Sequence, residues 1–189
     1  LFTPDELQTL NPMDINAFDR LATGKNSMKA HYASNVPLYG SYALPVLFLA
    51  DKETRRDFPQ ILSLFSETIL LNAGVTFLMK STFRRPRPYV FDPNVDLTRK
   101  QKRNAKASFV SGHTSTTAAN TFFMAKVYSD YFPDSKLKPY VWGSAIVVPA
   151  VTGYLRVRAG RHYPTDTIAG YIIGAAAGYF VTYLHRNTD

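Results

Sequence analysis

The sequence contains no cysteine among its 189 residues. Disulfide bonds, thiolate nucleophiles and cysteine metal sites are therefore excluded, whereas a reducing and an oxidising compartment both remain open. Internal repeats and low-complexity segments are missing as well. Because a chain of this length fits one domain of ordinary size, we expect a single domain over residues 1–189.

Acidic residues are in short supply. Asp and Glu together number 14 against 22 Lys and Arg, which gives a formal net charge of +8 and a pI near 9.7. Such a surplus attracts anions, and nucleic acid, an anionic membrane surface and small phosphate esters all meet that description. The total charge does not choose among them, so the positions of the charges have to decide.

Alternating β-branched patterns are scarce, and apolar residues at helical spacing dominate instead. The expected helices cover about residues 4–22, 37–50, 59–80, 114–131, 139–155 and 164–185, and a long surface loop rich in proline and basic residues covers 84–109. This pattern predicts an all-α helical bundle, with the long apolar stretch that follows Pro59 as its central helix. Gly170, Gly174 and Gly178 recur every fourth residue in the last helix, which predicts close packing against a neighbour.

The long apolar stretch also raises the question of a membrane span. Residues 61–79 nearly reach the length of about 20 residues that a bilayer requires, but they include Glu67 and Asn72. Since the mean hydropathy of the chain is −0.15, we expect a buried core helix and a soluble or peripheral protein. The first residues carry no signal peptide, because Thr3, Asp5 and Glu6 are polar or acidic. We therefore expect that a leader has been removed and that the location is periplasmic or membrane-associated.

Three clusters of residues suited to phosphate chemistry fall at expected helix ends. They are Lys80 with Arg84, Arg85 and Arg87-Pro88; Ser111-Gly112-His113; and Arg156 with His162 and Asp166. In a helical bundle, ends that are distant in sequence can converge at one mouth. We therefore expect the active site to form where these helix ends and loops converge.

The third cluster has the residues of an activated histidine nucleophile. Pro164 favours the first helical position, which puts His162 just before a helix and Asp166 in its first turn. A carboxylate that accepts the Nδ1 proton leaves the Nε2 lone pair free and stabilises the positive ring formed on attack. Arg156 can add a fork of donors to a phosphate at the helix N-terminus. An ordinary Asp–His contact at a helix cap explains the same residues without chemistry.

The other two clusters supply a cradle and a cation clamp. Ser111 can cap the following helix, Gly112 lets the backbone approach a ligand, and His113 can protonate a leaving oxygen. Lys80 and Arg87 can stabilise the charge that develops on a phosphoryl group. Each pattern has a plainer explanation, which is a capped helix with an exposed histidine in one case and cations at a helix C-terminus in the other.

The ordered set Lys80-x6-Arg87-Pro88, Ser111-Gly112-His113 and Arg156-x5-His162-x3-Asp166 resembles the three-part signature of the type 2 phosphatidic acid phosphatase superfamily. Vanadium haloperoxidases and bacterial class A acid phosphatases share this signature. The resemblance covers residues 80–166 and implies a helical phosphatase domain that needs neither metal nor cofactor. It implies that His162 attacks phosphorus to form a phosphohistidine, that Asp166 orients His162, and that His113 protonates the leaving group. The phosphate-binding residues implied are Lys80, Arg87, Ser111, Gly112 and Arg156.

The sequence departs from the family pattern at two positions. Val110 stands where the family usually has proline before Ser-Gly-His, and Leu155 stands where it usually has serine before the third-motif arginine. These changes affect loop rigidity and one hydroxyl contact. They leave the implied nucleophile, acid and cations complete, so we expect activity.

The implied substrates are phosphate monoesters or diphosphates. A basic loop near the expected site favours lipids of the phosphatidic acid, isoprenoid diphosphate or lipid A type. We expect a phosphate-containing small molecule or lipid as partner, an anionic membrane surface as a further one, and no nucleic acid. The alternatives are a vanadate-dependent haloperoxidase on the same anion site, a basic nucleic-acid-binding protein, and a non-catalytic membrane-associated scaffold. Bromide oxidation with vanadate and salt-dependent DNA binding distinguish the first two.

Overall fold

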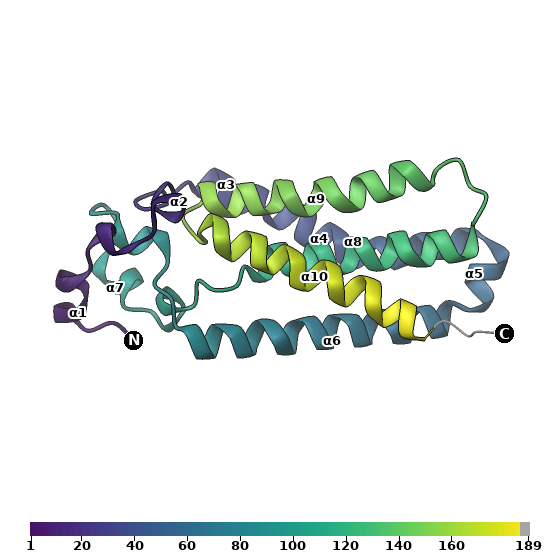
Figure 1. Ribbon diagram of the computed structural model, residues 1–189, viewed down its shortest axis with the longest axis horizontal. Coiled ribbons are helices and arrows are strands. Elements are labelled where there is room, and N and C mark those ends of the chain that lie inside the picture. The colour runs from purple at the N-terminus through teal and green to yellow at the C-terminus, as the bar shows by residue number, and fades with distance from the viewer. Residues whose placement is uncertain (186–189) are drawn as a thin grey trace.

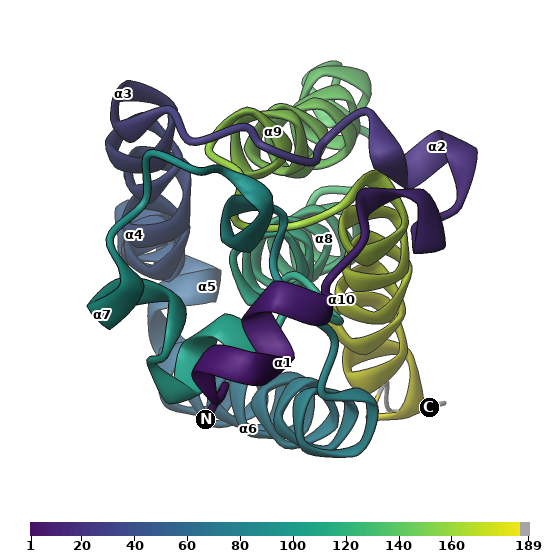
Figure 2. The same cartoon turned by 90° about the vertical axis from the view of Figure 1, so that its left-hand side faces the viewer.

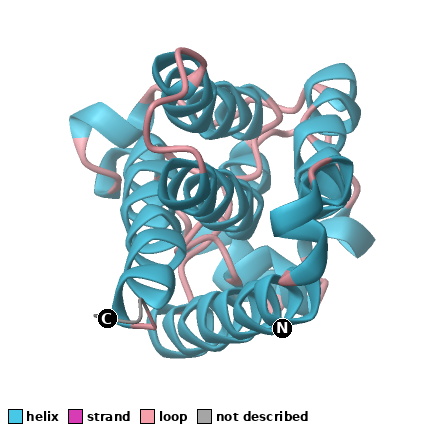
Figure 3. Ribbon diagram, turned by 90° about the vertical axis from the view of Figure 1, so that its right-hand side faces the viewer, coloured by secondary structure: helices cyan, strands magenta, loops and turns pink. Residues whose placement is uncertain are grey.

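The computed structural model describes residues 1–185, which form helices and no strand (Figure 3). The elements in chain order are α1 (Pro4–Thr9), η1 (Pro12–Asp14), α2 (Ala17–Arg20), α3 (Met28–Ala33), α4 (Asn35–Ala43), η2 (Leu44–Ala50), α5 (Lys52–Arg56), α6 (Phe58–Phe83), η3 (Pro88–Phe91), α7 (Leu97–Lys100), η4 (Arg103–Lys106), α8 (Gly112–Tyr131), α9 (Lys138–Arg158) and α10 (Pro164–Leu184), where η denotes a 3₁₀ helix. The all-α fold class predicted from the sequence is confirmed.

The centre of the bundle is α8, which packs against α4, α6, α9 and α10 (Figures 1 and 2). Small side chains dominate its buried surface, among them Thr114, Ser115, Thr117, Ala118, Ala119, Asn120 and Thr121. Small residues let several helices approach one axis closely. Within residues 1–185, none of the exposed large hydrophobic side chains belongs to α8.

The prediction that the long apolar helix forms the core is wrong. This helix, α6, lies at the edge of the bundle, and only 28% of its most apolar window is buried (Figure 2). Its inward face carries Thr68, Asn72 and Thr76, whereas Leu70 and Phe77 point outward and are 72% and 69% exposed. Over residues 68–77 the polarity of the helix is therefore reversed relative to that of a helix in a water-soluble protein, whereas Ile61 and Phe65 in its first turns are buried in the core.

The other outer elements show the same reversal. Large hydrophobic side chains are exposed along α4 and η2 (Val36, Tyr39, Val46, Leu47), along α9 (Tyr140, Ile146, Val147, Val151) and along α10 (Ile168, Ile172, Phe180, Leu184). Among residues 1–185, two helical segments, Phe58–Phe91 and Pro164–Leu184, are long and apolar enough to cross a bilayer. Such a continuous apolar exterior marks a surface that contacts another apolar phase.

The glycine row of α10 packs closely against α8, as the sequence predicts. A Cβ atom at Gly170 would lie 2.7 Å from the backbone oxygen of Ser111, and a Cβ at Gly174 or Gly178 would lie closer still to a backbone oxygen of α8. Because backbone atoms cannot give way as a side chain can, α10 approaches α8 only with glycine at these positions.

We expect Gly174→Ala to destabilise the fold by about 1–3 kcal/mol, because overpacking forces the two backbones apart. The matched control is Gly74→Ala in α6, where an added Cβ meets nothing within 4 Å. The control should be neutral or slightly stabilising, since alanine favours a helix interior over glycine. Thermal unfolding of both variants in detergent measures the difference, and equal melting temperatures would contradict the packing account.

The N-terminal helices are shorter and more often interrupted than the sequence predicts. The expected helix over residues 4–22 is divided into α1, η1 and α2, because Asn11 and Asn16 each accept a backbone N–H and start a new helical turn. The helix expected over residues 37–50 changes to a 3₁₀ helix at Leu44, next to Pro45. The expected long connection over residues 84–109 is present, with the short helices η3, α7 and η4 inside it. It is not wholly a surface loop as predicted, because Tyr89, Val90, Val95 and Ala105 are buried in a separate hydrophobic cluster.

Candidate active site

The four helix ends that carry the three motifs meet at one end of the bundle (Figure 1). They are the C-terminal ends of α6 and α9 and the N-terminal ends of α8 and α10, and Figure 2 looks onto them. The two N-terminal ends are directly joined, because the Ser111 N–H donates to the Asp166 carbonyl oxygen over 2.9 Å. The structure therefore brings the three clusters together as the sequence predicts.

His162 lies in the short connection between α9 and α10 and is 1% exposed. Its Nδ1 is 2.6 Å from the Ser108 carbonyl oxygen. A carbonyl only accepts, so Nδ1 carries the proton and Nε2 keeps its lone pair. Burial, reinforced by the positive charges of Arg87, Lys80 and Arg156, holds the pKa of His162 well below its ordinary value, against the opposing effect of the hydrogen bond to Ser108. The ring is thus neutral, with one nitrogen free to act as a nucleophile.

The expected hydrogen bond from His162 to Asp166 is not made, since Nδ1 and Oδ2 are 3.8 Å apart. Asp166 instead accepts from Arg85 Nη1 over 2.6 Å, from Ser108 Oγ over 2.5 Å and from the Tyr163 N–H over 2.9 Å. The last of these bonds caps α10. Asp166 therefore acts on His162 indirectly, through Ser108. The Ser108 hydroxyl donates to the carboxylate, and the Ser108 carbonyl oxygen accepts the hydrogen bond from Nδ1.

Arg85 connects Asp166 to the N-terminal part of the chain. Its Nη2 is 2.7 Å from Asp19 Oδ2, and its guanidinium lies 4.1 Å from the centre of the Tyr163 ring. Asp19 also accepts from the Thr165 N–H over 2.9 Å. Burial raises the pKa of Asp19, but hydrogen bonds from Thr165 and Arg85 outweigh it and leave that pKa lowered. A charged Asp19 therefore helps to fix the start of α10.

Lys80 and Arg87 line the site from the α6 side. Lys80 Nζ donates to the Ala107 carbonyl oxygen over 3.2 Å and to the Val110 carbonyl. Arg87 is 5% exposed, and its Nη1 donates to the Arg161 carbonyl oxygen over 3.1 Å. Backbone oxygens thus hold both side chains without pairing either with a carboxylate, so both can bind an anion.

Arg156, at the end of α9, is 3% exposed. Its Nη1 donates to His31 Nδ1 over 3.0 Å and to Ser34 Oγ over 3.2 Å. Its Nε is buried and has no partner within residues 1–185. A buried donor without a partner is costly, and an anion oxygen would satisfy it.

The Ser-Gly-His segment starts α8. Ser111 Oγ accepts the Thr114 N–H over 3.4 Å, which makes Ser111 the N-cap of the helix. A Cβ at Gly112 would lie 3.6 Å from Thr76 Cγ2 and 3.9 Å from Lys80 Cε, which are ordinary contacts, so packing inside the protein does not require glycine there. His113 Nε2 is 2.9 Å from Asn35 Oδ1 of α4, so the exposed histidine of the plainer explanation is ruled out for this half-buried ring.

Several residues that contact the site were not predicted from the sequence. Ser108, Asn35, His31 and Asp19 make the hydrogen bonds described above. A single serine, asparagine or histidine far from a motif gives no signal in one sequence. The position of Arg85 between Lys80 and Arg87 did indicate that it belongs to the site, but the sequence did not show which carboxylates it binds.

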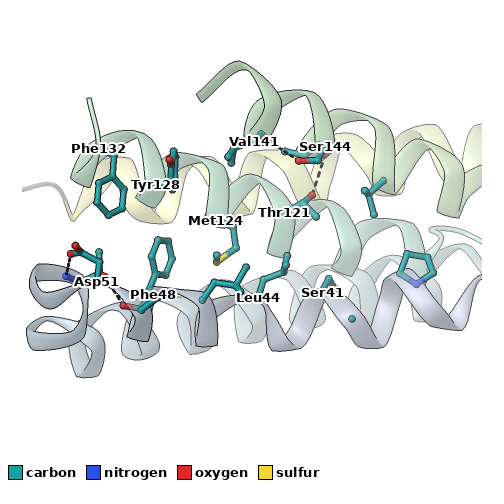
Figure 4. A pocket seen from close by; sticks show the side chains of 17 residues that line it. Ser41, Leu44, Phe48, Asp51, Thr121, Met124, Tyr128, Phe132, Val141 and Ser144 are labelled. Carbon is teal, nitrogen blue, oxygen red and sulfur yellow. Dashed lines mark hydrogen bonds between the residues drawn. The ribbon is translucent and has the colours of Figure 1, made fainter. Parts of the chain in front are cut away.

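Two cavities lie near the site. One, of about 660 Å³, is basic and is lined by Lys80, Arg84, Arg103 and Lys106. The other, of about 720 Å³, is an apolar groove between α4, η2, α8 and α9 (Figure 4). Leu44, Phe48 and Met124 point into it in Figure 4. None of the motif residues lines this groove, but it starts at Pro37, two residues from the Asn35 that binds His113.

Comparison with known proteins gives one family. Residues 61–189 match the model of the PAP2 superfamily. The lipid A 4'-phosphatase of Porphyromonas gingivalis is 33% identical over 79 residues, which are 42% of this chain and 30% of that protein. The chain thus aligns with less than a third of the length of this curated relative.

Two solved structures share the fold. The crystal structure of LpxE from Aquifex aeolicus superposes with a TM-score of 0.56 over 87% of this chain and 92% of that one, at 24% identity. The transmembrane PAP2-type phosphatidylglycerolphosphate phosphatase from Bacillus subtilis superposes with a TM-score of 0.64 over 92% of this chain and 85% of that one, at 22% identity. At these identities the likeness concerns the fold alone.

Proposed function

The chain belongs to the PAP2 superfamily, and from this membership and the geometry of the site we propose that it is a metal-independent phosphatase that hydrolyses lipid phosphate monoesters or diphosphates through a phosphohistidine. The observation that carries the proposal is the hydrogen bond from His162 Nδ1 to the Ser108 carbonyl, which leaves the Nε2 lone pair free. Burial and the cations beside the ring hold the pKa of His162 low and the ring neutral. A neutral ring beside positive charges favours attack on a phosphate anion.

In the proposed reaction, Nε2 of His162 forms a bond to phosphorus while the bond from phosphorus to the leaving oxygen breaks. His113 gives a proton to that oxygen. Water then attacks the phosphorus of the phosphohistidine and gives a proton to His113, while the bond from phosphorus to Nε2 breaks. Inorganic phosphate is released, and His162 returns to its neutral form. Lys80, Arg87 and Arg156 stabilise the charge on the phosphoryl oxygens in both steps.

A bound phosphate also explains how His113 can be protonated. Burial of its ring opposes protonation most strongly, and the surrounding cations, which include Arg156, Arg87 and Lys80, oppose it further. A phosphate dianion offsets those charges, so we propose that substrate binding and protonation of His113 occur together. Asn35 holds the ring in place until then.

The apolar exterior favours a lipid substrate and a location in the bilayer, in place of the soluble or peripheral protein expected from mean hydropathy. We propose that the helical bundle spans the membrane with the site at one end, where it meets lipid headgroups. The apolar groove suits a hydrocarbon chain, because it runs along α4 away from Asn35. Both phosphatases with solved structures and the Porphyromonas gingivalis enzyme are consistent with this proposal. The periplasmic side is the proposed location of the site.

We expect hydrolysis of a lipid phosphate to continue in EDTA, because Lys80, Arg87 and Arg156 supply the charge stabilisation that a metal gives in other phosphatases. We also expect inhibition by vanadate, which adopts the geometry of phosphorus under attack. A panel of phosphatidic acid, undecaprenyl diphosphate, lipid A and p-nitrophenyl phosphate in detergent micelles measures both. Loss of activity in EDTA with recovery on adding Mg²⁺ or Zn²⁺ would contradict the mechanism. Bromide oxidation in place of hydrolysis when vanadate is added would indicate a haloperoxidase.

A further inference from the structure

A second group of cationic side chains lies beside the cations of the proposed phosphate site. Arg99 comes from α7 and Arg161 immediately precedes His162. Their guanidinium carbons lie 4.6 and 5.5 Å from the centre of the Tyr89 ring, and both side chains are half-buried. Tyr89, which is itself buried, therefore holds two guanidinium groups in one place.

These two arginines have no acidic counterpart. Within residues 1–185, the ion pairs include neither Arg99 nor Arg161. The side chain of Arg99 donates to the neutral amide of Asn26 over 3.1 Å, and Arg161 Nε is buried without a partner in this part of the chain. Burial, together with the charge of Arg99, lowers the pKa of Arg161. Like charges held together without a carboxylate are unfavourable unless an anion joins them.

His31 links this group to the phosphate site. Its Nδ1 accepts from Arg156, so the proton of the neutral ring is on Nε2, which can donate to an anion. Burial and the positive charges of Arg161, Arg156, Arg99 and Arg87 lower the pKa of His31 to about 4. The backbone makes the same connection, because the Arg161 N–H donates to the Arg156 carbonyl over 3.1 Å and the Arg161 carbonyl accepts from Arg87.

We propose that Arg99, Arg161 and His31 form a second anion subsite, which binds the inner phosphoryl group of a diphosphate substrate. The outer phosphoryl group then lies on the cations around His162. This inference rests on the proposed function and narrows its substrate class to diphosphates. A phosphomonoester brings a charge of about −1.5 to −2 at neutral pH, and the inner phosphoryl group of a diphosphate adds a further negative charge for these otherwise unpaired cations.

With a diphosphate, His162 attacks the outer phosphoryl group and the inner one leaves. Nε2 of His162 bonds to the outer phosphorus, and the bond from that phosphorus to the bridging oxygen breaks. The bridging oxygen stays with the inner phosphoryl group, which leaves as a monophosphate ester held by Arg99 and Arg161. Charge that develops on this oxygen is stabilised directly by the subsite.

The test compares farnesyl diphosphate with farnesyl monophosphate in detergent micelles, because the two substrates share one hydrocarbon chain. We expect Arg161→Gln and Arg99→Gln each to lower kcat/KM for the diphosphate by about 10–100-fold, the range for a lost charge-assisted hydrogen bond. Activity on the monophosphate should change by less than about threefold. The matched control is Arg158→Gln, an exposed arginine at the end of α9 whose side chain donates to the Tyr154 hydroxyl. This variant should change neither activity.

Equal losses on the two substrates, or no loss on the diphosphate, would overturn the subsite. A binding measurement separates this failure from failure of the proposed function. Calorimetry compares methylenediphosphonate with methylphosphonate, which bind without being hydrolysed. The subsite predicts tighter binding of the diphosphonate and loss of that preference in Arg161→Gln, even if the unaltered protein hydrolyses neither farnesyl ester. Equal affinities for the two phosphonates contradict the subsite whatever the activity.

Discussion

His162→Ala should abolish the hydrolysis of every phosphate ester, with a fall in turnover of about 10⁴-fold or more, because no phosphoenzyme can form without the nucleophile. A better leaving group should not restore the activity. The reason is that the leaving group changes the ease of breaking its bond to phosphorus, whereas the variant has no atom to make the new bond. Steady-state rates on an alkyl phosphate and on p-nitrophenyl phosphate measure the loss.

A second variant separates chemistry from folding, since His162 is buried and its loss leaves a hole. His162→Asn keeps a donor near the position of Nδ1, which can still reach the Ser108 carbonyl, but has nothing in place of Nε2. It should fold and be inactive. His185→Ala, at the exposed far end of α10, is the matched control and should retain full activity. Substantial activity in folded His162→Asn would contradict the assignment of His162 as the nucleophile.

His113→Ala should slow the hydrolysis of alkyl phosphates by about 10²–10⁴-fold, which is the usual contribution of a general acid. An aryl ester should lose far less in the first step, because its leaving oxygen departs without a proton. Sensitivity should therefore follow the pKa of the leaving group. Single-turnover rates on the two kinds of ester are needed, since slow dephosphorylation can hide the contrast at steady state.

Equal losses on the alkyl and aryl esters would contradict the role of His113 as an acid. Such a result would instead indicate that the ring positions the substrate or the α8 N-terminus. Asn35→Ala helps to distinguish these cases, because it removes the partner of His113 Nε2 without touching the ring. A positioning role predicts a weaker affinity with the same loss on both esters.

The sequence predicted the fold class, the four long helices and the end of the bundle at which the motifs meet. Helix type followed from apolar periodicity, and Ser111 and Pro164 marked the starts of α8 and α10. The place of α6 could not be predicted in this way. Thr68, Asn72 and Thr76 form a polar stripe on this apolar helix, and periodicity alone does not say whether the stripe faces inward or outward. The structure turns it inward, against α8.

In the site, residue types with one strong chemical role were predicted, and their hydrogen-bond partners were not. The sequence indicated that His162 and Asp166 are neighbours, but Nδ1 donates its hydrogen bond to a backbone carbonyl and not to the carboxylate. Every residue has such a carbonyl, so Ser108 carries no signal. Arg85 and Asp19 meet across the fold, and their pairing depends on where the N-terminal segment crosses the bundle. The chemical roles of the motif residues remain proposals.

Trapping of the phosphoenzyme tests the central claim most directly. The protein is mixed with a labelled lipid phosphate for less than one turnover and quenched in base, where a phosphohistidine survives, and the labelled peptide is then identified by mass spectrometry. The account predicts label on the peptide that contains His162, and none in His162→Asn. Label on a different residue, or label that persists in His162→Asn, would contradict it.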